Sequence, residues 1–168
     1  MQITGKFIAL TDKNNQTYYG IEIKPIDVEA YITHLRLNNV SEDFISQKLN
    51  RDHGAYHITV ANTMVSNKFK ENLVFNNIIN EFLNKDFTFD VFGIGYVHVN
   101  EKEIDKQAWF VVCDNHELQT KFSEIGVLQD YHITLAFNPS DVFRVRKNQE
   151  SVLYSIEQIF SRNKKPSI

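Results

Sequence analysis

The sequence predicts one domain that mixes strands with helices and is built from two similar halves. Its 168 residues fit a single domain of ordinary size, and 42% apolar residues provide material for a core. Segments in which apolar and polar residues alternate are interleaved with segments of helical spacing. The tetrapeptide Tyr-His-Ile-Thr occurs at 56–59 and at 131–134, each time after a predicted strand and helix. We therefore expect residues 1–168 to form one domain with two lobes that face each other across a cleft.

Strands are predicted where apolar residues alternate or form short runs between turn residues. Residues 3–12 alternate loosely before a turn-rich stretch. In the next segment Tyr19, Ile21 and Ile23 share one face, and Pro25 ends the strand. The predicted strands span residues 17–25, 55–63, 86–99, 107–114 and 130–137.

Helices are predicted where apolar residues recur every three or four positions. Asp27 and Ser41 are expected to cap the first two helices. Asn115 or Asp114 is expected to cap a later helix, which Gly126 ends. The predicted helices span residues 27–39, 41–50, 66–84, 116–126 and 148–160, and the basic end of the chain is predicted to fray.

The overall charge limits the kind of partner. A formal net charge of −3 disfavours a general nucleic-acid binder, which usually has a basic surface. We therefore expect no extended duplex as partner, while a small anionic ligand or a single nucleic-acid end fits the composition. We also expect the chain to act as a monomer.

Cysteine use and the terminal sequence indicate the compartment. Cys113 is the only cysteine, so no internal disulfide is expected, and it lies in an apolar run typical of a core thiol. The first ten residues lack the pattern of a signal peptide, and no apolar run approaches the roughly 18 residues that span a membrane. We expect a cytoplasmic protein without membrane attachment.

The repeated tetrapeptides carry the residues with chemical potential. Side chains alternate across a strand, so His57 and Thr59 share one face, while Tyr56 and Ile58 point to the other. The same alternation puts His132 and Thr134 on one face of the second strand. Each half of the chain thus presents one imidazole and one hydroxyl from a strand whose opposite face can pack in the core.

Two such strands facing one cleft would suit chemistry at phosphorus. A neutral histidine can remove a proton from water or a ribose hydroxyl, and a protonated histidine can protonate the leaving oxygen. Threonine hydroxyls can donate hydrogen bonds to the non-bridging phosphate oxygens. This arrangement needs no metal and no cofactor, and we predict none. His53 lies four residues before His57, but this spacing indicates a metal site only on a helix. His57 is predicted in a strand and Gly54 lies between the two histidines, so a metal site is not expected.

These motifs make the chain resemble the two-histidine (2H) phosphoesterase superfamily. Its members include LigT-like RNA ligases, cyclic phosphodiesterases and 2′-5′-oligoadenylate phosphodiesterases. The mark of the family is a pair of motifs of the form hydrophobic-His-hydrophobic-Thr-hydrophobic, which stand here as YHITV (His57, Thr59) and YHITL (His132, Thr134). The resemblance covers roughly residues 2–160. It implies that His57, Thr59, His132 and Thr134 are the catalytic residues.

The resemblance also implies an α+β fold with pseudo-two-fold symmetry, antiparallel sheets along a central cleft and helices outside. The implied activity is metal-independent hydrolysis of 2′,3′-cyclic phosphates or 2′-5′ phosphodiesters of nucleotides, oligonucleotides or RNA ends. An alternative is hydrolysis of 3′-5′-linked cyclic oligonucleotide signals, as in resembling phage anti-defence members. A non-catalytic module that binds nucleotides or RNA ends is the alternative from another class.

Several other residues are candidates for ligand contact. Some family members have an acidic residue and a lysine after the second motif, where this chain has Asp141 and Lys147. Arg144 and Arg146 complete a basic cluster with Lys147 that is expected either to contact phosphate or a base, or to be a solvated loop and helix start. Trp109, Tyr18 and Tyr19 are candidates for stacking on a base, with core packing the preferred interpretation for Trp109. His34 and His116 are expected at the surface, and the glycines at 93 and 95 predict a bulge in their strand.

Overall fold

One antiparallel sheet forms the centre of the structure, a computed structural model that describes residues 1–161. In that part of the chain the sheet has seven strands in the order β3-β2-β1-β4-β5-β6, with β7 paired to β4. The strands are β1 (Gln2–Thr11), β2 (Thr17–Ile23), β3 (Tyr56–Ala61), β4 (Asp86–Glu101), β5 (Ile104–Asp114), β6 (His132–Asn138) and β7 (Val152–Ser155). The α+β class is therefore confirmed. The separate sheets implied by the resemblance are replaced by one continuous sheet, because β1 pairs with both β2 and β4.

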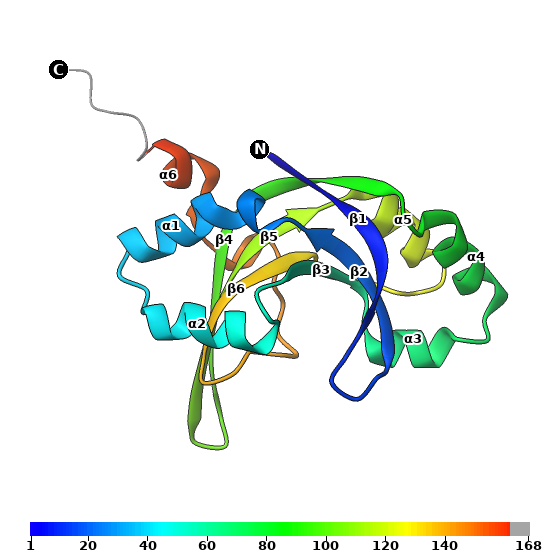
Figure 1. Ribbon diagram of the computed structural model, residues 1–168, viewed down its shortest axis with the longest axis horizontal. Coiled ribbons are helices and arrows are strands. Elements are labelled where there is room, and N and C mark those ends of the chain that lie inside the picture. Colours follow the sequence, from blue (N-terminus) through cyan, green and yellow to red (C-terminus); the bar gives the residue numbers. More distant parts are fainter. Residues whose placement is uncertain (162–168) are drawn as a thin grey trace.

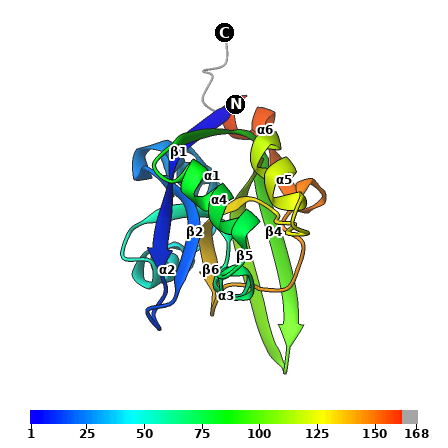
Figure 2. The ribbon, with the colours of Figure 1, turned by 90° about the vertical axis from the view of Figure 1, so that its right-hand side faces the viewer.

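Helices fill the connections between strands. Within residues 1–161 there are six α-helices: α1 (Glu29–Leu37), α2 (Glu42–Arg51), α3 (Thr63–Phe69), α4 (Leu73–Phe82), α5 (His116–Ser123) and α6 (Ile156–Ser161), besides the 3-10 helices η1 (Pro25–Val28) and η2 (Gln149–Ser151). Figure 1 shows α1, α2 and α6 toward one end of the sheet and α3, α4 and α5 toward the other. The hairpin of β4 and β5 projects beyond the other strands (Figure 2). None of the described helices is long and apolar enough to cross a membrane.

The two faces of the sheet have different partners. Ile58 and Ile133, the third residues of the repeated tetrapeptides, are fully buried in the main core together with residues of α1, α2, α4, α5 and α6. Because side chains alternate along a strand, the histidines and threonines of the tetrapeptides lie on the opposite face. Part of that face is covered by a smaller apolar cluster, which consists of Ala108, Phe110, Val112, Phe137 and Val142.

Both strands that contain a tetrapeptide leave their regular register at the same point. In β3 the pairing with β2 shifts directly after Thr59, so that Val60 is the extra residue. In β6 the pairing with β5 shifts directly after Thr134, so that Leu135 is the extra residue. A bulge bends a strand and increases its twist, so both threonines lie where their strands turn. The bulge predicted in β4 is also confirmed, as the register with β5 shifts between Val91 and Gly93.

The predicted helix over 66–84 is wrong in extent, because the segment forms two helices. Asn62 and Asn72 each begin a helix, and their side chains accept hydrogen bonds from the backbone N–H groups of Val65 and Phe75. A side chain that caps N–H groups starts a helix rather than continuing one. The predicted cap Ser41 is confirmed, since its hydroxyl accepts from the backbone of α2.

The predicted helix over 148–160 is also wrong in extent, since this segment forms η2, β7 and the start of α6. Residues Val152–Ser155 form β7, which pairs with β4 at Gly93 and Ile94. A Cβ at Gly93 would lie 2.2 Å from the carbonyl oxygen of Tyr154, so the glycine permits this pairing. At the first predicted helix, Asp27 lies inside η1 and makes no cap. The terminal residues 162–168 lie outside the described part of the chain.

Gly20 provides a test of the close approach of β2 to β3. A Cβ at this position would lie 2.5 Å from the carbonyl oxygen of Ile58, so Gly20→Ala must separate the two strands. We expect the substitution to lower the free energy of unfolding by about 1–3 kcal/mol in urea titrations. Thr17→Ala, at an exposed position on the same strand, should change it by less than about 0.5 kcal/mol. Equal stability of Gly20→Ala and the unchanged protein would contradict this packing.

Candidate active site

The two histidines lie on strands from opposite ends of the sheet. His57 belongs to β3 and His132 begins β6, and these are the end strands of the six-strand path. The sheet curves so strongly that Cα atoms of β3 and β6 come within 8 Å of each other, although these two strands do not pair (Figure 1). A positive charge on His57 lowers the pKa of His132. The curvature therefore brings the two imidazoles within electrostatic reach of each other.

His57 is flanked by polar and aromatic groups of the first half of the chain. It lies opposite Glu22 of β2, and the ring of Tyr18 approaches it edge-on with a centroid distance of 5.9 Å. Burial lowers the pKa of His57 below its ordinary value of 6.5. The carboxylate of Asp52 acts in the opposite direction and Lys48 in the same direction as burial. His57 therefore titrates below neutrality but keeps carboxylates nearby that favour its protonated form.

His132 is held in one tautomer by the backbone. Its Nδ1 lies 2.8 Å from the carbonyl oxygen of Asp130, which can only accept, so Nδ1 carries the proton and Nε2 is the free acceptor. Phe110 approaches the ring edge-on at a centroid distance of 5.7 Å. Burial lowers the pKa of His132 to about 4, and the charges of Lys147 and His57 act in the same direction. The hydrogen bond to the backbone of Asp130 acts in the opposite direction. His132 is therefore neutral at physiological pH, with Nε2 ready to accept a proton.

The two threonines differ in burial and in the hydrogen bonding of their hydroxyls. Thr59 is partly buried, and its hydroxyl makes no hydrogen bond with residues 1–161. Thr134 is more buried, at 9% exposure, and its hydroxyl lies 3.5 Å from Oδ2 of Asp141. That distance is at the limit of a hydrogen bond, so both hydroxyls are able to turn toward a ligand.

Asp141 is the centre of a buried charge network that sequence reasoning found only in part. Arg51 of α2 donates from Nη1 to Oδ2 at 2.8 Å, and Lys147 donates from Nζ to Oδ1 at 3.2 Å. Burial alone would raise the pKa of Asp141, but the charge of Lys147 and the hydrogen bond from Arg51 outweigh it and lower the pKa. Asp141 and Lys147 are each 5% exposed. The interpretation of this stretch as a solvated loop is therefore wrong for these two residues.

The network continues along α2 in residues that sequence reasoning missed. Asp52 accepts two hydrogen bonds from Arg51, both 2.9 Å long, and forms an ion pair with Lys48 at 3.2 Å. Lys48 is only 2% exposed. Its buried ammonium also donates to the carbonyl of Ala55 and lies 3.7 Å from the ring centroid of Tyr56. The spacing of Lys48, Arg51 and Asp52 along one helix face was the available signal. The same spacing of charged residues is typical of an ordinary solvated helix surface, so it did not indicate a site.

The remaining basic and aromatic candidates lie in other surroundings. Arg146 is exposed and engaged with both carboxylate oxygens of Asp130, at 2.7 and 2.9 Å. Arg144 is exposed at a positive φ of 64°. Trp109 and Tyr19 pack on aromatic rings in and beside the main core, so of the three aromatic candidates only Tyr18 flanks a histidine.

The other histidines and the cysteine lie outside this site. The expectation of a surface position for His34 is wrong, because it is 3% exposed and packs edge-on against Tyr154 at 4.7 Å. His53 and His116 are exposed, and Cys113 is buried, as predicted for a core thiol. Among residues 1–161, no group of three histidines, cysteines or carboxylates is arranged to hold a metal ion.

The fold and the paired motifs place the chain in the class of two-histidine phosphoesterases. The family model described as Swiss Army Knife, 2H phosphoesterase domain matches residues 26–143. Since the match covers more than half of the chain, the protein belongs to this 2H phosphoesterase family, and membership implies phosphoesterase activity. No curated protein and no solved structure is significantly similar to it. β1 and β2 precede the matched region but complete the sheet between β3 and β4.

The lowered pKa of His132 makes stability depend on pH. Between pH 6.5 and about 4 the unfolded chain binds a proton at this residue while the folded chain does not. The free energy of unfolding must therefore fall as the pH falls through this range, by up to about 1.4 kcal/mol per pH unit for one proton. In urea titrations at several pH values we expect His132→Gln to flatten this dependence. His116→Gln, at an exposed position, should keep the full slope, and an equal slope in both variants would contradict the buried neutral state of His132.

Proposed function

We propose that the protein is a metal-independent phosphodiesterase acting on 2′,3′-cyclic phosphates or 2′-5′ phosphodiester bonds of nucleotides, oligonucleotides or RNA ends. The observation that carries this proposal is that β3 and β6, the strands of His57 and His132, lie side by side although they are the end strands of the six-strand path. Acid–base catalysis at phosphorus requires two such groups on one phosphate. The family match supports phosphoester chemistry, and the bond and substrate are our inference.

The two histidines take different roles in this mechanism. His132 is the base, because it is the more strongly neutral and its Nε2 is free: it removes a proton from water as the water oxygen bonds to phosphorus. The bond from phosphorus to the departing ribose oxygen breaks, and protonated His57 gives its proton to that oxygen. Asp52 and Asp141 favour this protonated form of His57. Proton exchange with water then restores both imidazoles.

The negative phosphate is stabilised by hydroxyls and by the surrounding charges. We assign Thr59 and Thr134 to the non-bridging oxygens, because each lies two residues beyond a histidine on the same strand face. The halves β1-β2-β3 and β4-β5-β6 would then form two lobes with pseudo-two-fold symmetry around one cleft. The equivalent bulges after the two threonines support this arrangement.

A panel of substrates tests the proposal directly. The protein would be incubated with nucleoside 2′,3′-cyclic phosphates, 2′-5′-linked dinucleotides and 3′-5′-linked cyclic di- and trinucleotides, with and without EDTA. We expect turnover of the first or second group, unchanged by EDTA. Loss of activity in EDTA and its return with a divalent metal would overturn the metal-free mechanism. Turnover of the third group alone would favour a signal hydrolase, and binding without turnover would indicate a non-catalytic module.

Substitution of the histidines tests their roles. His57→Ala and His132→Ala should each lower kcat by about 10²–10⁴-fold, because each removes one proton-transfer group. Thr59→Val and Thr134→Val should cost less, about tenfold, since each removes one of several donors to the phosphate. His116→Ala, at an exposed site on α5, is the matched control and should retain full activity. Full activity of either active-site alanine variant would exclude that histidine from catalysis.

The pH dependence of kcat/KM tests the state of the free enzyme. Activity should rise as His132 loses its proton, near pH 4, and fall as His57 loses its proton, below pH 6.5, because both pKa values are lowered. We therefore expect a bell-shaped profile with its maximum on the acidic side of pH 6.5. The profile of kcat should lie at higher pH, since a bound phosphate anion raises both pKa values. A kcat/KM maximum well above neutrality would contradict these assignments.

A further inference from the structure

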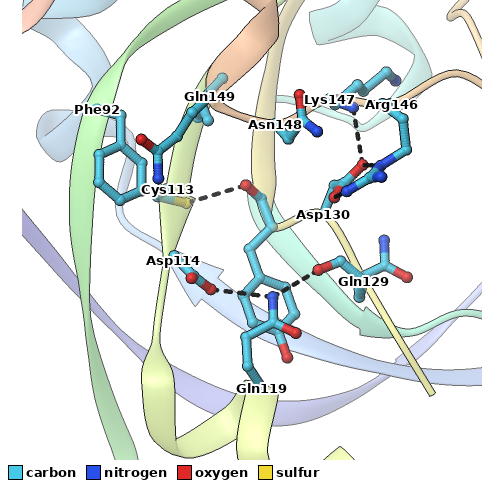
Figure 3. A pocket seen from close by; sticks show the side chains of 12 residues that line it. Phe92, Cys113, Asp114, Gln119, Gln129, Asp130, Arg146, Lys147, Asn148 and Gln149 are labelled. Atoms are coloured by element: carbon cyan, nitrogen blue, oxygen red, sulfur yellow. Dashed lines mark hydrogen bonds and ion pairs between the residues drawn. The ribbon is translucent and has the colours of Figure 1, made fainter. Parts of the chain in front are cut away.

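A pocket beside His132 is not accounted for by the two-histidine chemistry. It has a volume of about 210 Å³ and lies between β4, β5, the residues before β6 and the segment 146–149. Figure 3 shows Phe92 and Gln149 on one side of it and the Arg146–Asp130 pair on the other, with Asn148 between them. Neither of the two histidines and neither of the two threonines lines it, but its lining residue Tyr131 directly precedes His132.

This pocket is connected to the proposed active site through His132. Asp130 lines the pocket, and its backbone carbonyl accepts the hydrogen bond that His132 donates from Nδ1. Val112 also lines the pocket and lies opposite His132 in the register of β5 and β6. Residues that lie opposite each other point to the same face of a sheet. Cys113 and Tyr131, which belong to the main core, also line the pocket, so it lies next to His132 with lining residues from both faces of the sheet.

The charges around the pocket are already engaged with one another. Arg146 is bound to both oxygens of the Asp130 carboxylate, and the backbone N–H of Lys147 donates to the same group at 3.1 Å. The ammonium of Lys147 is directed to Asp141. A phosphate would have to compete with these carboxylates, whereas a neutral polar group would not. The pocket thus favours an uncharged ligand next to the phosphate site.

The other polar side chains of the pocket include several carboxamides and the carboxylate of Asp114, which accepts a hydrogen bond from Gln119. Gln149 is exposed, and its side chain makes no hydrogen bond with any residue from 1 to 161. Asn148 uses its side-chain oxygen to accept from Glu150, so its amide donors remain available. Phe92 lies on β4, which contacts η2, the short helix that begins at Gln149. A flat ring with donors and acceptors along its edge can stack on Phe92 and bond to both carboxamides.

We infer that this pocket binds the nucleobase of the substrate whose phosphate lies between His57 and His132. The inference rests on the proposed function. Ligand pockets for whole small molecules have about 300–1,000 Å³, so about 210 Å³ suits one ring system. Base contacts of this kind act on substrate binding and not on proton transfer. Phe92 and Gln149 are therefore assigned as binding residues for the base.

The experiment compares substrates with and without a base. Initial rates would be measured with a nucleoside 2′,3′-cyclic phosphate and with 1-O-methylribose 2′,3′-cyclic phosphate. Gln149→Leu removes the carboxamide, and Phe92→Leu removes the ring while keeping an apolar side chain. We expect each to raise KM for the nucleotide about tenfold, with kcat unchanged and with no change for the ribose compound. Gln16→Leu, in the exposed loop between β1 and β2, is the matched control and should change neither value.

The outcomes separate the inference from the proposed reaction. If the unchanged protein turns over both compounds with the same KM, or if Gln149→Leu affects both equally, the base pocket is overturned while the reaction stands. If no ester is turned over, the reaction is wrong. Calorimetric titration with a nucleoside 3′-monophosphate and with methylribose 3-phosphate then decides about the pocket. Tighter binding of the nucleotide that is lost in Gln149→Leu supports it, and equal binding of the two compounds overturns it.

Discussion

The buried carboxylate of Asp141 is the interaction on which the arrangement of the site depends. It accepts from Arg51, which is 90 residues away in the sequence, and from Lys147 on its own segment. Buried charges are expensive unless they are paired, and the removal of one partner leaves the others uncompensated. The network therefore fixes α2 against the segment after β6, and through it the first half of the chain against the second. That contact keeps β3 beside β6, although these two strands share no backbone hydrogen bonds.

The same network sets the charge that a substrate would meet. Three cations, Lys48, Arg51 and Lys147, and two carboxylates, Asp52 and Asp141, act on the pKa values of the two histidines. One net positive charge remains, which matches the single negative charge of a phosphodiester. Burial is the largest influence that lowers the pKa of both histidines, and at His132 the charge of Lys147 lowers it further. A bound phosphodiester would neutralise the net positive charge of the network. Protonation of the histidines would therefore become more favourable when the substrate is present.

The sequence was informative where a pattern is local. The caps Ser41 and Asn115 and the strands around both tetrapeptides follow from side chains that act within a few residues. β7 could not be predicted, because its residues have helical spacing and its partner, β4, lies more than fifty residues earlier. The residues of the candidate site also divide into those that a local pattern reveals and those that only a long-range contact reveals. Its histidines stood out as repeated motifs, whereas Arg51 became recognisable only through its contact with Asp141.

Identical tetrapeptides do not make identical half-sites, because the strand next to each one differs. Thr59 lies opposite Gly20, whereas Thr134 lies opposite Phe110, at the equivalent point before each bulge. Glycine brings no side chain to the partly buried first motif, whereas the phenylalanine ring packs edge-on against His132. Burial is the largest influence on both imidazoles, but only for His132 does it lower the pKa as far as about 4. The difference between base and acid would then originate in β2 and β5, outside the repeated motifs.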